Sequence, residues 1–117
     1  KYWDTYSVHL VEPLMNMLSP TDHVVDSWVR RDKNFTCLVL IWESGIKTTI
    51  TTMGDVSVPI SFRVMGDKGW CDLTFNDTFT AFRVALQKFI DGVLHRQDYI
   101  PRQFTLDVVD IIERGRA

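Results

Sequence analysis

The residues best suited to chemistry stand near the start of the chain, where Glu12 follows His9 by three positions. Side chains three residues apart share one face of a helix. A carboxylate beside a histidine fixes its tautomer and stabilises its cation, so the pair could act as a general base. The same pair also arises in helices that have no catalytic role. Asp4 and Tyr6 fall on helical positions that neighbour His9 and Glu12.

Other reactive patterns are missing from the sequence. His23 opens an expected strand and His95 ends an expected helix, which predicts structural or solvated roles for both. The three histidines lack the local spacing of metal ligands, so we predict no metal site. No serine lies in a G-x-S-x-G motif, and no two glycines are separated by a single residue. We therefore expect no cofactor to bind to this chain alone, because it has no phosphate-binding glycine loop.

Length and composition limit the number of domains and the kinds of partner that the chain can have. The 117 residues fit one domain, and a net charge of −2 gives no electrostatic reason to expect nucleic acid or an anionic membrane as partner. The longest apolar run, residues 37–42, is too short to span a bilayer. Two cysteines, Cys37 and Cys71, are too few for a disulfide scaffold, which predicts reduced, buried thiols and a cytoplasmic location. The chain begins with Lys1, so we expect a piece of a longer protein.

Helical periodicity appears at both ends. Residues 4–18 carry apolar side chains three and four apart, with Pro13 expected to kink or split the helix. Residues 79–93 give the strongest periodic signal, preceded by Asn76 or Asp77 as N-cap. A last short helix begins near residue 106 and is expected to end at Arg114 and Gly115.

The middle of the chain predicts five strands in a meander, at 24–31, 35–43, 46–53, 58–64 and 70–75. The fold class expected is α+β: a mainly antiparallel sheet of about five to six strands with helices packed on one face. Residues 35–42 are apolar on both sides, and only one side can meet the helices. The other face is then open for dimerisation, and we expect a two-fold dimer there.

Three stretches together resemble one known family. The sequence WDTYSVHLVE at 3–12 is similar to the start of the C-terminal domain of the glucose–fructose oxidoreductase, inositol dehydrogenase and rhizopine catabolism family (Gfo/Idh/MocA), where a helix carries a histidine followed three residues later by an acidic residue. Residues 62–70 resemble its strand, Gly-x-x-Gly turn and strand. Residues 79–117 resemble its closing pair of helices. Many members carry an aspartate four residues before the histidine, where this chain has Thr5, with Asp4 one residue earlier.

The resemblance implies a role for the chain. Residues 1–117 would be the C-terminal substrate-binding and oligomerisation domain of an NAD(P)-dependent dehydrogenase acting on a sugar, polyol or related compound. The NAD or NADP and the catalytic lysine would belong to an N-terminal Rossmann domain of the same chain, which is absent here. His9 would be catalytic, assisting proton transfer at the substrate hydroxyl. The residues expected to bind substrate are its neighbours Trp3, Asp4, Thr5, Tyr6 and Glu12.

A second hypothesis of another class stays open. The same sheet could serve a non-catalytic module that associates with a partner or binds a small ligand. A glycine-rich strand–turn–helix and a Glu-Lys-Pro motif upstream of Lys1 would favour the enzyme. In either case the partners expected are a small molecule and further copies of the chain, through the sheet face, with neither nucleic acid nor membrane.

Overall fold

The computed structural model describes residues 1–116 and divides them into two units. The first comprises residues 1–58 together with the C-terminal residues from 102, and the second comprises residues 59–101. Both contain helices and antiparallel strands, which confirms the α+β class. The five expected strands form two sheets, of three and two strands, instead of one sheet.

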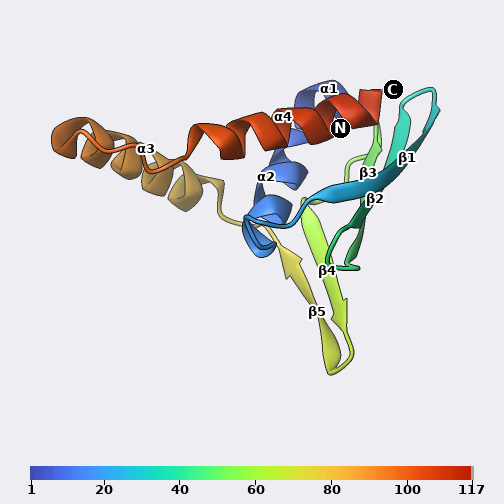
Figure 1. Ribbon diagram of the computed structural model, residues 1–117. Coiled ribbons are helices and arrows are strands. Elements are labelled where there is room, and N and C mark those ends of the chain that lie inside the picture. The colour runs from blue at the N-terminus through green and yellow to red at the C-terminus, as the bar shows by residue number, and fades with distance from the viewer. Residues whose placement is uncertain (117) are drawn as a thin grey trace. The chain divides into compact units, whose positions relative to one another are not determined.

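The first unit is a three-stranded sheet with three helices (Figure 1). The strands are in the order β1-β2-β3, and both pairs are antiparallel. Their bounds are β1 Val24–Asp32, β2 Phe35–Trp42 and β3 Lys47–Met53. The helices are α1 Trp3–Tyr6, α2 Val8–Met17 and α4 Arg102–Arg116.

The core lies between one face of this sheet and the helices. Along β2 the burial alternates, and the side chains of Leu38, Leu40 and Trp42 are almost completely buried. They form one cluster with apolar residues of the other elements, namely Trp3, Val11, Ile50, Val108 and Ile111. Within the first unit, the expectation that helices cover one face of the central strand is confirmed.

The opposite face of the sheet is left partly open. Phe35 is exposed, and Cys37, Val39 and Ile41 are half-buried. The register places Trp28 of β1, itself exposed, beside Val39. This face therefore has an apolar centre that no element of the first unit covers.

The N-terminal helical segment breaks at a different residue from the one expected. Pro13 lies inside α2, whereas the break between α1 and α2 falls at Ser7. The buried Ser7 keeps helical dihedral angles (φ −58°, ψ −32°), and its carbonyl accepts from the amides of Leu10 and Val11. Pro13 lacks an N–H, so it removes only the hydrogen bond to the carbonyl of His9, and the helix tolerates that loss.

The second unit consists of a hairpin and one long helix. Its elements are β4 Ser61–Gly66, β5 Gly69–Thr74 and α3 Thr78–His95. β4 begins two residues after Pro59, which cannot donate to a ladder. Asp77 is the N-cap of α3, as one of the two expected residues, and accepts a hydrogen bond from the Thr80 amide at 2.9 Å.

No residue from 59 to 101 is buried. The expectation of buried thiols is wrong for Cys71, which is exposed on β5, and Cys37 of the first unit is only half-buried. Both thiols are free. Within residues 1–116, no helix combines the length and the apolar character needed to cross a bilayer.

Gly115 has a packing role that the sequence did not indicate. It lies inside α4 instead of ending it, and a Cβ there would overlap the six-membered ring of Trp3. Alanine normally stabilises a helix by about 1 kcal/mol over glycine. Because the ring blocks that gain, we expect Gly115→Ala to lower the free energy of unfolding by about 2 kcal/mol.

Chemical denaturation of the two proteins measures this difference. Gly66→Ala is the matched control, because a Cβ at Gly66 meets nothing closer than 3.9 Å. A Gly115→Ala variant as stable as the wild type would contradict the packing role.

Candidate functional site

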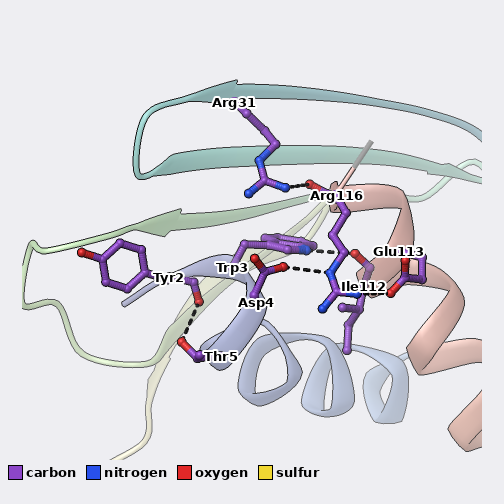
Figure 2. A network of polar contacts seen from close by, with 9 residues as sticks. Tyr2, Trp3, Asp4, Thr5, Arg31, Ile112, Glu113 and Arg116 are labelled. Atoms are coloured by element: carbon purple, nitrogen blue, oxygen red, sulfur yellow. Dashed lines mark hydrogen bonds and ion pairs between the residues drawn. The ribbon is translucent and has the colours of Figure 1, made fainter.

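Trp3 anchors the segment that carries the candidate residues. Its side chain is buried, and Nε1 donates a 2.9 Å hydrogen bond to the carbonyl of Ile112 in α4 (Figure 2). The glycine at 115 leaves room for the ring. The structure thus places Trp3 in the core, while the other candidates, Asp4, Thr5, Tyr6, His9 and Glu12, are exposed.

Asp4 is engaged by the C-terminal helix. Its carboxylate accepts from Nε of Arg116 at 2.8 Å, and Arg116 also contacts Glu113 at 2.5 Å (Figure 2). The hydrogen bond to Asp4, followed by the charges of Glu113 and Asp4, raises the pKa of the Arg116 guanidinium. Asp4 is therefore paired with α4, and no contact joins it to His9 among the described residues.

His9 is exposed on α2 beside an aromatic ring. The centroids of the Tyr6 and His9 rings are 5.5 Å apart, with the planes tilted by 60°. The ammonium of Lys1 lies 5.1 Å from the centre of the same Tyr6 ring. His9 makes no hydrogen bond or ion pair with any residue from 1 to 116, so its imidazole is accessible to a solute.

The residues around the start of α1 form a second polar cluster. The Tyr2 hydroxyl donates to Asp55, whose other oxygen accepts from the Asn34 amide at 3.1 Å. The hydrogen bond to Asp55, with desolvation, raises the pKa of Tyr2. Thr5 directs its hydroxyl to the Tyr2 carbonyl at 3.5 Å, the long contact drawn in Figure 2. No sequence signal pointed to the Tyr2–Asp55 contact, which joins residues 53 positions apart.

A cavity of about 190 Å³ lies elsewhere in the first unit. It does not include His9. Its lining comes from α2, β1, β2, α4 and the turn before β1: Met15, Asp22, His23, Val24, Trp42, Asp107, Asp110, Ile111 and Arg114. This volume is below the roughly 300–1,000 Å³ typical of small-molecule sites.

Of the polar residues that line the cavity, Asp22, Asp110 and Arg114 are paired through their side chains. Asp22 accepts from the Ser44 hydroxyl at 2.5 Å and from two backbone amides at 3.1 Å. Arg114 contacts Asp110 at 2.8 Å and the Ser27 hydroxyl at 3.2 Å. Within the described chain, no group of three or more metal-ligating side chains comes together. The small volume and the pairing of Asp22, Asp110 and Arg114 make the cavity a less suitable reaction site than the exposed face of α2, although His23 also lines it.

No family model, curated protein or solved structure matches this chain. What its surface can do therefore rests on its own chemistry. That chemistry amounts to an accessible imidazole, a flanking phenol ring and a carboxylate three residues further on the same helix.

The hydrogen bonds to the Asp22 carboxylate make the stability of the fold depend on pH. The Ser44 hydroxyl, and then the amides of Ser44 and His23, hold the pKa of the Asp22 carboxyl below its ordinary range. A carboxyl with a lowered pKa stabilises the fold when ionised, and the contribution is lost as the pH falls through the folded-state pKa. We expect the wild type to melt at a higher temperature than Asp22→Asn at neutral pH, with the difference shrinking below about pH 4.

Thermal melts of both proteins from neutral pH to acid test this expectation. Asp32→Asn serves as control, since Asp32 makes no side-chain hydrogen bond or ion pair within residues 1–116. A Tm difference that stayed constant across the range would show that Asp22 does not act through its charge.

Proposed function

We propose that this chain is the substrate-binding and oligomerisation domain of an NAD(P)-dependent oxidoreductase, with His9 as its acid–base group. The observation that carries the proposal is the exposed imidazole of His9 beside the Tyr6 ring, on a helix fixed to the core through α1. A histidine that is held in place yet unpaired can pass a proton to or from a substrate hydroxyl. The resemblance of residues 3–12 to the Gfo/Idh/MocA domain supports the same role.

The hydride chemistry would reside outside this chain. An N-terminal Rossmann domain would bind NAD or NADP and would supply the catalytic lysine. The polyol or sugar hydroxyl would lie between the nicotinamide and His9. Hydride would pass from the carbinol carbon to oxidised NAD or NADP, and the His9 imidazole would take up the hydroxyl proton, leaving a carbonyl product. Tyr6, Thr5 and Glu12, all exposed, would contact the rest of the substrate.

Turnover of the full-length protein tests the role of His9. We expect His9→Ala to lower kcat/KM for its sugar or polyol substrate by about 10²-fold or more, the scale of a lost acid–base group. His23→Ala is the matched control, because His23 is also exposed but lines the 190 Å³ cavity. Loss of activity in His23→Ala, with His9→Ala unchanged, would move the site from α2 to the cavity.

Isolated residues 1–117 offer a test of where the cofactor binds. Since the chain has no phosphate-binding glycine loop, we expect calorimetric titration with NADH or NADPH to give no heat of binding up to millimolar concentration. Micromolar binding would mean that the cofactor site lies in this chain, which would contradict its placement in a Rossmann domain.

A second function, association between copies, is favoured by the open face of the three-stranded sheet. Its apolar centre contains Trp28, Val39 and Ile41, and charged residues such as Asp26, Arg30 and Lys47 lie at its margins in the same register. An apolar centre inside a polar rim is the usual anatomy of a protein interface. We propose a two-fold dimer that buries more than roughly 1,200 Å² at this face.

Substitution at the centre of the face tests this dimer. We expect Trp28→Lys to weaken association about tenfold or more in sedimentation experiments at tens of micromolar, because the charge would be buried at the contact. Val56→Lys is the control, since both side chains are 55% exposed but Val56 follows β3 and lies outside the sheet. Equal masses for both variants and the wild type would contradict the sheet-face dimer.

A further inference from the structure

Helix α3 carries an apolar stripe that nothing in its own unit covers. Phe79, Phe82, Leu86, Phe89 and Val93 recur at spacings of three, four, three and four residues. The three phenylalanines are 75%, 69% and 69% exposed, and no residue of α3 is buried. A strict alternation of three and four is the a/d pattern of a helix that packs against another helix.

The residues beside the stripe suit contact with an identical helix. With Phe79 at heptad position a, the stripe occupies positions a and d. The flanking e and g positions are then 78, 83, 85, 90 and 92, and Arg83 is the only charged residue among them. Charges at these positions set partner choice in coiled coils, and like charges oppose pairing. Two copies of α3 can therefore approach each other with little electrostatic repulsion.

The exposed area is large enough for a specific contact. An aromatic side chain has a surface of about 150–250 Å². At their exposed fractions, the three phenylalanines together therefore expose roughly 300–500 Å² per copy. Leu86, Ile90, Val93 and Leu94 are also exposed and add to it. Two copies together reach the lower limit of roughly 1,200 Å² for a stable protein interface.

We propose that the α3 stripe, Phe79, Phe82, Leu86, Phe89 and Val93, packs against the same stripe of a second copy of this chain. The contact is isologous, because each helix presents the same residues to the other. It goes beyond the proposed function, as it uses neither His9 nor the open face of the three-stranded sheet. Two different isologous contacts on one chain can link more than two copies, whereas either contact alone links only two.

Sedimentation of the Trp28→Lys protein, in which the sheet contact is weakened, tests the α3 contact separately. At tens of micromolar we expect Trp28→Lys to sediment as a dimer and Trp28→Lys with Phe82→Lys as a monomer. Trp28→Lys with Val84→Lys is the control and should stay a dimer, because Val84 is exposed at position f, opposite the stripe. A monomeric Trp28→Lys protein, or a dimer that survives Phe82→Lys, would overturn the proposal.

Amide hydrogen exchange gives an independent reading on the wild-type chain. Amides of residues 78–95 should gain protection as the protein concentration rises, since an isolated helix of this length frays readily in water. The Phe82→Lys variant should show no such gain. Protection that is independent of concentration would mean that α3 packs within its own chain, and it would overturn the proposal even if the variants failed to fold.

Discussion

The contact between Trp3 and α4 fixes the arrangement of the first unit. The indole fills space that Gly115 leaves free, and its N–H satisfies the carbonyl of Ile112. Arg31 of β1 donates to the Gly115 carbonyl at 3.3 Å, so strand, first helix and last helix meet at one point. Trp3 and helix α4 lie at opposite ends of the chain. The three-stranded sheet is therefore covered by helices only when both ends have come together.

The contact between Trp3 and α4 also determines which candidate side chains face α4 and which face solvent. With Trp3 buried, Asp4 on the next helical position faces the last turn of α4 and pairs with Arg116. Tyr6 and His9 are left on the solvent side, in contact with each other. Asp4 therefore pairs with Arg116 and not with His9, and Glu12 is the carboxylate on the histidine's own helix.

Local patterns allowed most elements to be predicted, whereas contacts between distant residues could not be. The alternation in residues 35–42 predicted that one side of β2 would meet the helices, without indicating which side, and Asp77 was one of the two residues expected as N-cap. The role of Gly115 and the burial of Trp3 depend on each other across 112 positions, and neither leaves a local signature. The split into two sheets likewise depends on which strands pair, which alternation within a strand does not encode.

The two faces of the three-stranded sheet separate the two proposed roles of the first unit. Helices α1, α2 and α4 cover one face, and His9 projects from α2 on that side, away from the core. Trp28, Val39 and Ile41 lie on the other face. A second copy bound there would leave His9 accessible, so a Rossmann domain could approach the helical side without competing with the dimer. Association and proton transfer are thus compatible in one molecule, because the sheet stands between the surfaces that each of them requires.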